Sequence, residues 1–284
     1  INYGTFELDD LAIINYTSGT SGFSKGVMIP YRAVRSNIEF AKKVLPQLNN
    51  TSRVVAMLPT AHMYGLMFEV LYELSAGCHV FFLSRLPSPK IIMQALSEVK
   101  PTLVVAVPLI IEKIYKSKVK PVLEKSGIRF AMKLPGLDQL IMNKIKAELV
   151  NAFGGEFYEV IIGGAAFNKE VEAFFKRMEF PFTVGYGMTE CAPIITYDDY
   201  KTAKLYSCGR IVPNMEMKID SPDPQNIPGE LLVRGANVFL GYYKNEEATK
   251  EVLQEDGWFH TGDMGVIDAD GYLFLRGRSK CMIL

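Results

Sequence analysis

Short apolar runs alternate with segments of helical period over the first two thirds of the chain. Leu11–Ile14, Val27–Ile29 and Val54–Leu58 are typical of buried strands, whereas Tyr31–Leu45 repeats its apolar residues with the period of a helix. Strands that alternate with helices predict an α/β fold, with a largely parallel sheet and flanking helices. The same pattern predicts strands over residues 78–83, 102–107, 158–162 and 182–184, and helices over residues 65–74, 90–99, 109–151 and 168–178, with Asn168 as an N-cap.

Beyond Tyr197 the pattern changes to short strand candidates separated by turns. Asp268–Gly271 is typical of a turn that joins two strands as a hairpin, and only residues 245–253 have a helical period. We therefore expect a small β-barrel or β-sandwich subdomain over residues 203–276. The predicted strands cover residues 215–219, 229–234, 265–267 and 272–275, and the predicted segments of the chain are 1–48, 49–202, 203–276 and 277–284.

The composition excludes several classes of protein. Hydrophobic residues make up 49% of the 284 residues, which is typical of a folded chain. Lys and Arg number 31 and Asp and Glu number 31, so no net charge favours nucleic acid. Four scattered cysteines and the absence of a signal peptide favour a cytoplasmic setting. Since the chain begins at Ile1 and ends at Leu284 without a polar tail, we expect an excised fragment.

The stretch Tyr16–Val27 is rich in hydroxyls and glycines and lies between two predicted strands. Glycines let backbone N–H groups approach a ligand, hydroxyls add donors, and Lys25 supplies a cation, which together suit a polyphosphate. A flexible Ser/Gly linker is the alternative, but linkers rarely lie between two apolar strands. The spacing does not match G-x-x-x-x-G-K-[ST], which disfavours a generic kinase or GTPase. The residues that we expect to bind phosphate are Thr17, Ser18, Gly19, Thr20, Ser21, Gly22 and Lys25.

Three further motifs follow predicted strands. They are Thr60-Ala61-His62, Gly163-Gly164-Ala165-Ala166 and Gly185-Tyr186-Gly187-Met188-Thr189-Glu190. In open α/β sheets the carboxyl ends of strands are where ligands bind. We therefore expect these motifs to lie around one site.

The loop over residues 16–27 resembles the signature loop of the adenylate-forming superfamily, which comprises acyl-CoA synthetases, nonribosomal adenylation domains and beetle luciferases. Further motifs of that superfamily follow in order. Leu58-Pro59-x-x-His62 resembles its gating motif, Tyr186–Glu190 its magnesium and phosphate motif, and Gly229 to Tyr243 its barrel motif. Trp258–Asp263 and Arg276–Lys280 resemble its ribose and hinge motifs, with Lys280 in the hinge to a C-terminal lid. The resemblance covers essentially the whole chain and implies an incomplete adenylate-forming large domain.

The resemblance implies that the protein binds ATP, Mg²⁺ and coenzyme A. It gives catalytic roles to Lys25, which would offset phosphate charge, and to His62, which would gate the acyl carboxylate. Thr189 would donate to the α-phosphate and Glu190 would bind Mg²⁺. The substrate's own carboxylate would attack the α-phosphorus, releasing pyrophosphate and leaving an acyl-adenylate.

The resemblance also implies a nucleotide site. Asp263 and Arg278 would bind the ribose, and the adenine would lie between Tyr186 and the turn Gly164-Ala165-Ala166, with Gly187 beside it. Each residue taken alone has a simpler reading. His62 could be an ordinary partly buried histidine, Thr189-Glu190 a capping pair, Asp263 a turn residue and Arg278 a surface charge, and Tyr242-Tyr243 are taken as structural.

The residues after His62 bear on which acid is activated. Nonribosomal domains that take α-amino acids place an aspartate there, whereas this chain has Met63, so an ammonium group has no obvious partner. Pro108–Tyr115 and Thr189–Pro193 resemble long-chain fatty acid–CoA ligases in particular. We therefore expect a long- or medium-chain fatty acid as substrate. The expected acyl pocket consists of Met63, Gly65, Gly185 and Met188, with ordinary core packing as the alternative role for the two methionines.

The sequence leaves three rival functions open. An acyl-AMP ligase would load a carrier protein instead of coenzyme A, a nonenzymatic module would bind adenylate only, and a luciferase-like oxygenase would share the same motifs. The adenylation lysine of the superfamily lies on its C-terminal lid, so we expect the 284 residues alone not to turn over. The sequence does not decide oligomeric state or peripheral membrane association.

Overall fold

The computed structural model describes residues 5–17, 24–134 and 136–278. In the described residues, two parallel sheets in the middle of the chain lie between antiparallel strands at its beginning and end. The strands are β1 (Leu11–Thr17), β2 (Lys25–Pro30), β3 (Arg53–Ala56), β4 (His79–Phe82), β5 (Val104–Ala106), β6 (Val160–Ile162), β7 (Phe182–Val184), β8 (Tyr186–Gly187), β9 (Ile194–Tyr197), β10 (Arg210–Ile211), β11 (Met215–Asp220), β12 (Gly229–Gly235), β13 (Gly241–Tyr242), β14 (Phe259–Ile267) and β15 (Leu273–Arg278). The α-helices are α1 (Tyr31–Val44), α2 (Met63–Leu66), α3 (Tyr72–Ser75), α4 (Pro89–Val99), α5 (Pro108–Ile114), α6 (Lys120–Leu123), α7 (Ser126–Ala131), α8 (Leu137–Ala152), α9 (Lys169–Arg177) and α10 (Glu246–Val252). Two π-helical segments, η1 (Met67–Leu71) and η2 (Tyr115–Val119), and a 3₁₀ helix, η3 (Thr189–Cys191), complete the described elements.

The first two strands form a hairpin that pairs with a strand from the last part of the chain. β1 pairs antiparallel with β2, with Thr17 opposite Lys25, and β13 pairs with the other side of β2. The side chains of Val27 and Ile29 on β2 are fully buried in a core cluster that also contains residues of β12 and β13. Segments about 200 residues apart in sequence are therefore held against each other at the base of the predicted phosphate loop.

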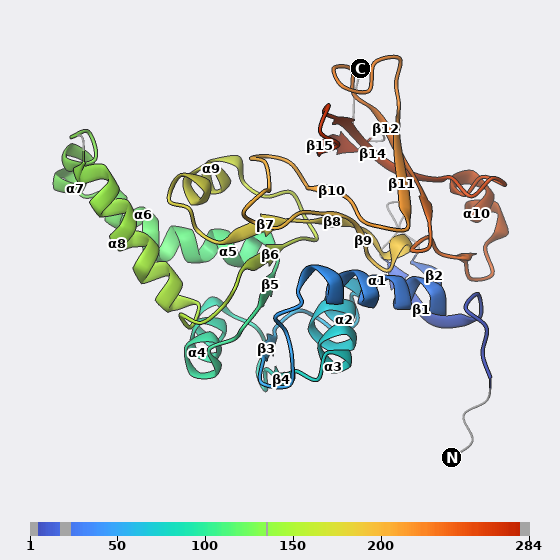
Figure 1. The fold of residues 1–284 in the computed structure, drawn as a ribbon, viewed down its shortest axis with the longest axis horizontal. Helices are drawn as coiled ribbons and strands as arrows, with labels where there is room; N and C mark the ends of the chain where they lie inside the picture. Colours follow the sequence, from blue (N-terminus) through green and yellow to red (C-terminus); the bar gives the residue numbers. More distant parts are fainter. Residues whose placement is uncertain (1–4, 18–23, 135, 279–284) are drawn as a thin grey trace.

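The middle of the chain contains the predicted parallel strands. β3 pairs parallel with β4, and β5, β6 and β7 form a parallel sheet in that order. Helices α4, α5, α8 and α9 contribute buried side chains to the apolar cluster around β5–β7 (Figure 1). Because β5 and β6 are covered by helices, their sequences are continuous apolar runs, as the sequence pattern predicted, whereas β4 is largely exposed.

A helical excursion leaves this parallel sheet between β5 and β6. Residues 108–152 are almost entirely helical, from α5 through η2, α6 and α7 to α8, and α7 with the adjoining end of α8 projects from the body (Figure 1). The predicted cap at α9 is confirmed, because Asn168 Oδ1 accepts from the N–H groups of Glu170 and Val171 at 3.0 and 3.2 Å. Among the described residues, no helix combines the length and the apolar character needed to cross a bilayer.

The C-terminal β region differs from the barrel that we expected. It is an open antiparallel sheet with the strand order β11-β12-β14-β15, so within the described residues its edge strands do not pair with each other. Four strands are too few to close a sheet into a barrel with a filled interior. The predicted hairpin is confirmed, because β14 and β15 pair antiparallel with Ile267 opposite Leu273.

Candidate functional site

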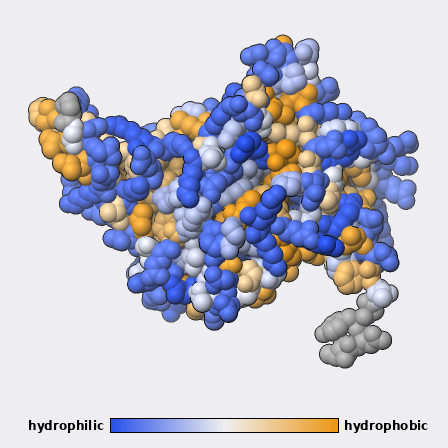
Figure 2. Space-filling model, in the orientation of Figure 1, coloured by the Kyte–Doolittle hydropathy of each residue, from blue (hydrophilic) through white to orange (hydrophobic). Residues whose placement is uncertain are grey.

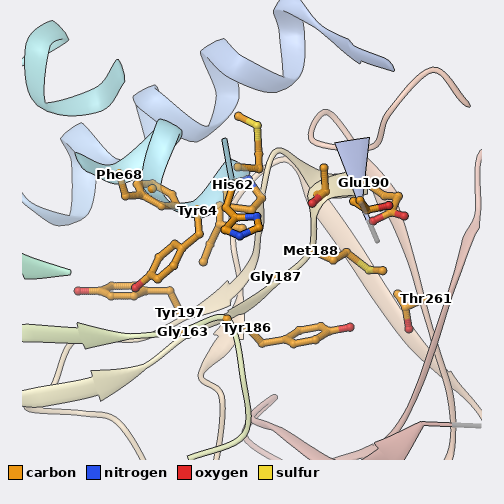
Figure 3. Close-up of a pocket in the computed structure, with 18 of the residues that line it drawn as sticks. His62, Tyr64, Phe68, Gly163, Tyr186, Gly187, Met188, Glu190, Tyr197 and Thr261 are labelled. Atoms are coloured by element: carbon orange, nitrogen blue, oxygen red, sulfur yellow. The ribbon is translucent and has the colours of Figure 1, made fainter. Parts of the chain in front are cut away.

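A cavity of about 1230 Å³ lies where the N-terminal hairpin, the parallel strands and the C-terminal sheet meet (Figure 3). Its lining comes from elements that are distant in sequence: the N-terminal hairpin, the loops that follow the parallel strands, and the C-terminal sheet. The structure therefore brings most of the predicted residues into one place. Those that line it are Thr17, Lys25, His62, Met63, Gly65, Gly164, Gly185, Tyr186, Gly187, Met188, Thr189, Glu190 and Arg278.

Some of the predicted site residues do not line the cavity in the part of the chain that the structure describes. Ser18, Gly19, Thr20, Ser21, Gly22 and Lys280 lie outside the described residues. Ala165 and Ala166 are exposed and are not among the described residues that line the cavity, so only Gly164 represents that turn. Asp263 is buried behind the wall, where it contacts two residues that do line the cavity.

Lys25, Tyr242 and Glu190 form a contact chain on the polar side of the cavity. The Lys25 ammonium lies 4.6 Å from the centroid of the Tyr242 ring, and the Tyr242 hydroxyl donates to Glu190 Oε1 at 2.9 Å. Burial, together with the Glu190 carboxylate, raises the pKa of Tyr242, so the phenol stays protonated and acts as the donor. The pairing of β13 with β2 sets this geometry, because it places Tyr242 opposite Val27 and close to Lys25.

The backbone leading to Glu190 is fixed by close packing at Gly187. A Cβ at Gly187 would lie 2.1 Å from the carbonyl oxygen of Pro193, so a larger residue would displace this segment. The backbone of Glu190 is also held, because its carbonyl accepts from the Phe239 N–H at 2.9 Å. Thr189 and Glu190 belong to the 3₁₀ helix η3, with Met188 as its N-cap residue, so they do not form the capping pair considered as an alternative.

Asp263 joins Tyr186 and Arg278 at the far end of the cavity. Its Oδ2 accepts from the Tyr186 hydroxyl at 2.7 Å, and its Oδ1 accepts from Arg278 Nε at 3.1 Å. Asp263 and Arg278 are opposite each other in the β14–β15 pair, which accounts for the ion pair. Burial and the nearby Asp263 carboxylate raise the pKa of Tyr186, so its neutral hydroxyl is the donor. Asp263 therefore lies within strand β14 and not in a turn, and Arg278 is an exposed charge that pairs with Asp263.

His62 is the N-cap residue of α2 and lies on an exposed segment. The side chain of Asn15 on β1 donates to the carbonyl of Ala61 at 3.0 Å, which ties this segment to the N-terminal hairpin. His62 is exposed and lines the cavity, so the alternative of a partly buried histidine is wrong. Its ring is drawn beside Tyr64 in Figure 3.

The opposite side of the cavity is apolar. The predicted acyl-pocket residues Met63, Gly65, Gly185 and Met188 all line the cavity, and Met63 is only 2% exposed. The Tyr64 hydroxyl donates to the Ile161 carbonyl at 3.1 Å, and its ring packs edge-on against Phe68. Further apolar residues on this wall belong to one buried cluster, and sequence reasoning missed them: Ala41, Val44, Leu45, Leu58, Tyr64, Phe68, Tyr72, Leu103, Val105, Val107 and Ile161.

Two other groups on the wall were not assigned from the sequence. Tyr242 was taken as structural, although its hydroxyl contacts Glu190. His260 Nδ1 lies 2.9 Å from Glu230 Oε2, and its Nε2 lies 2.6 Å from Gln254 Nε2, so a hydrogen-bonded group lines the cavity beside Thr261. Glu230 and His260 lie on the paired strands β12 and β14, and the alternation of side chains along those strands could have placed them on one face of the sheet. Nothing local in the sequence pointed to Tyr242.

Glu190 is the candidate ligand for a metal ion in the cavity. No group of three or more His, Cys, Asp or Glu side chains in the described part of the chain could hold a metal ion by itself. Glu190 offers one carboxylate at the part of the cavity wall that also holds Lys25 and Thr189, and Glu230 and Glu251 line the cavity as well. Mg²⁺ in nucleotide sites is often held by one or two carboxylates, with phosphates and waters as its other ligands, so this arrangement fits Mg²⁺ bound together with a nucleotide.

The chain is similar to known proteins in both sequence and fold. The family model described as AMP-binding enzyme matches residues 4–243. The chain is 31% identical to long-chain-fatty-acid–CoA ligase 1 of Saccharomyces cerevisiae over 97% of its own length and 42% of that protein. It is 32% identical to the probable 4-coumarate–CoA ligase 2 of Dictyostelium discoideum over 96% of its own length and 46% of that protein.

A solved structure has the same fold. A malonyl-CoA ligase in a ternary product complex with methylmalonyl-CoA and AMP superposes with a TM-score of 0.74 at 26% identity, covering 96% of this chain and 54% of that one. The chain spans less than half the length of the two curated relatives named above.

Proposed function

The chain belongs to the AMP-binding enzyme family, and we propose that it carries the nucleotide and acyl sites of an ATP-dependent fatty acid–CoA ligase. The proposed reaction has two steps. A fatty acid carboxylate attacks the α-phosphorus of ATP, which forms acyl-adenylate and releases pyrophosphate. The thiol of coenzyme A then attacks the acyl carbon, which forms acyl-CoA and releases AMP.

The single observation that carries this proposal is the division of the cavity into a polar and an apolar side. Lys25, Thr189 and Glu190 lie on one side, and the buried apolar cluster with Tyr64 and Phe68 lies on the other. A substrate with a carboxylate and a long hydrocarbon chain could place each part against matching surroundings. The side with Lys25 and Glu190 supports the proposal of a nucleotide, and the apolar wall independently supports the proposal of a fatty acid.

Lys25 and Glu190 are proposed to act on the phosphates. The Lys25 ammonium would offset the negative charge that otherwise repels the attacking carboxylate, and Thr189 would donate to the α-phosphate. Glu190, positioned by the Tyr242 hydroxyl, would hold Mg²⁺. The bound ion would neutralise charge on the phosphate oxygens.

Asp263, Tyr186 and Arg278 are proposed to hold the nucleoside. The Asp263 carboxylate can accept hydrogen bonds from both ribose hydroxyls, with its position fixed by Tyr186 and Arg278. The Tyr186 ring and the exposed Gly164 turn give the adenine two flat surfaces. His62 would lie beside the reacting carboxylate, where it would gate the path of the acid and later of the thiol.

The relatives include ligases of aromatic acids, so the choice of acid needs its own test. We would measure acid-dependent exchange of labelled pyrophosphate into ATP by the full-length protein, because the 284 residues alone are not expected to turn over. The acids are saturated fatty acids of increasing length, 4-coumarate and malonate. The proposal expects the highest kcat/KM with a medium or long fatty acid. A preference for 4-coumarate or malonate would overturn the substrate assignment, and absence of exchange with every acid would overturn the ligase assignment. Replacing coenzyme A by an acyl carrier protein in the second step would separate the two acceptors.

A further inference from the structure

The projecting helical excursion carries an exposed apolar surface at its end. Four large apolar side chains on or beside α7 and the start of α8 are exposed: Phe130 by 67%, Leu134 by 40%, Leu137 by 43% and Leu140 by 64%. We call these four residues the apolar tip. Figure 2 shows hydrophobic side chains gathered at this end of the molecule, with hydrophilic ones beside them. Neither of the cavities described in this structure includes the tip.

The chain around the apolar tip is strongly basic. Residues 116–133 contain six Lys or Arg and one acidic residue, Glu124, a local charge of +5 in a chain whose formal net charge is zero. All six cations are exposed, and Lys120 pairs with Glu124 at 3.8 Å. The other five have no ion pair with any described carboxylate: Lys116, Lys118, Lys125, Arg129 and Lys133.

We propose that the apolar tip and the basic residues from Lys116 to Lys133, which lie on and between η2, α6 and α7 and just after α7, dock the protein onto an anionic lipid bilayer surface. Apolar side chains on a basic helical segment insert at the boundary between headgroups and acyl chains, and the cations bind anionic headgroups. Five of the six cations are lysines, whose compact charges suit a diffuse negative surface. Protein interfaces are instead depleted of lysine and enriched in arginine, which disfavours an acidic protein as the occupant.

The proposal does not depend on the assignment of the enzyme's substrate. The apolar tip lies on the helical excursion, whereas the residues proposed to bind nucleotide lie on the strands and on the C-terminal sheet (Figure 1). Changes at the tip should therefore alter lipid binding without altering the cavity.

The test is cosedimentation of the protein with vesicles of phosphatidylcholine alone or of equimolar phosphatidylcholine and phosphatidylserine. We expect binding to the anionic vesicles only, with weakening as the salt concentration rises. The affinity of the double variant Arg129→Glu/Lys133→Glu for anionic vesicles should fall at least about tenfold, since each basic residue near an anionic surface strengthens binding. The matched control is Lys42→Glu/Lys43→Glu, two exposed lysines at the end of α1, which should leave binding unchanged.

The apolar contribution is tested by Phe130→Ser, with Phe82→Ser on β4 as its control, because Phe82 is 59% exposed and lies outside the tip. Only the tip variant should lose binding. In a separate variant, Phe130→Trp, tryptophan emission should shift to the blue on addition of anionic vesicles. Equal binding by the wild type and the tip variants, no binding to either vesicle, or a change of oligomeric state in the tip variants without lipid would each overturn the proposal.

Discussion

The Tyr242 hydroxyl donates a hydrogen bond to Glu190 Oε1 at 2.9 Å. The two residues come from different parts of the chain, because Glu190 follows the parallel strands and Tyr242 lies on β13, which pairs with the N-terminal hairpin. The same tyrosine ring lies under the Lys25 ammonium. One side chain therefore links the proposed phosphate cation to the proposed metal ligand.

Removing only the Tyr242 hydroxyl tests this link. Tyr242→Phe keeps the ring against Lys25 but leaves Glu190 Oε1 without its donor. A hydrogen bond to a charged group contributes about 1.5–3 kcal/mol, so we expect pyrophosphate exchange to fall about tenfold or more. The concentration of Mg²⁺ needed for half-maximal rate should rise in titrations of the variant.

Tyr243→Phe is the matched control, because Tyr243 is 42% exposed and lies one residue further along the chain. It should leave the magnesium dependence unchanged. An unaltered magnesium titration for Tyr242→Phe would show that this hydroxyl does not position the metal ligand.

Asp263→Asn should weaken nucleotide binding. The amide keeps the size of the side chain but loses the charge that pairs with Arg278 and accepts from Tyr186. We expect the KM for ATP to rise about tenfold while the KM for the fatty acid changes little, since a charge-assisted hydrogen bond to a hydroxyl contributes about 1.5–3 kcal/mol. Asp220→Asn, at the exposed end of β11, serves as the control. An equal rise in both KM values would point to general damage instead of a nucleoside role.

Gly187→Ala should disturb the segment that carries Thr189 and Glu190. The added Cβ would lie 2.1 Å from the Pro193 carbonyl oxygen, so the backbone must move. Overpacking of this kind typically costs about 1–3 kcal/mol of stability, and we expect a lower melting temperature with a larger loss of activity. Gly127→Ala on α7 has open space around its Cβ and favours the helix, so it should lower neither quantity. Wild-type activity in Gly187→Ala would show that this close packing does not position the site.

Stability should depend on pH through a buried glutamate outside the site. Glu73 is fully buried, and burial raises its pKa from 4.5 to about 7. Between these values the folded state binds more protons than the unfolded state, so the free energy of unfolding falls as the pH rises from about 4.5 to about 7. Glu73→Gln removes this titration. As the pH rises through that window, the wild type should lose about 3 kcal/mol of its free energy of unfolding that the variant does not lose.

Urea unfolding at pH 5 and pH 8 measures this difference. Glu148→Gln, an exposed residue on α8, provides the control and should have the pH dependence of the wild type. The same pH dependence in Glu73→Gln as in the wild type would contradict the raised pKa.

The helices and strands were predictable because their signals are local. Apolar runs at β3, β5 and β6 reflect strands covered on both faces, and the Asn168 cap is visible within four residues of sequence. The closure of the C-terminal sheet was not predictable. A strand pattern shows which face of a strand is buried but does not show which strands pair at the edges.

The candidate site was predictable where its residues follow strand ends, as His62, Tyr186 and Glu190 do. Tyr242 was missed because its role depends on a β13–β2 pairing across more than 200 residues, which no local pattern encodes. The apolar wall was missed for a related reason. Residues such as Leu45 and Val105 have the pattern of ordinary core positions, and only the packing of α1 against the sheet leaves a cavity beside them.

The two half-reactions test the central claim most directly, that Lys25 acts on the phosphates during activation of the acid. In Lys25→Ala the rate of acyl-adenylate formation should fall far more than the rate of thiol transfer from preformed acyl-adenylate, because pyrophosphate has already left in the second step. Lys244→Ala, which removes a cation lying over the Tyr243 ring, is the matched control and should affect neither rate. A selective loss of adenylate formation in single-turnover measurements is the predicted result. Equal loss in both half-reactions would contradict the account.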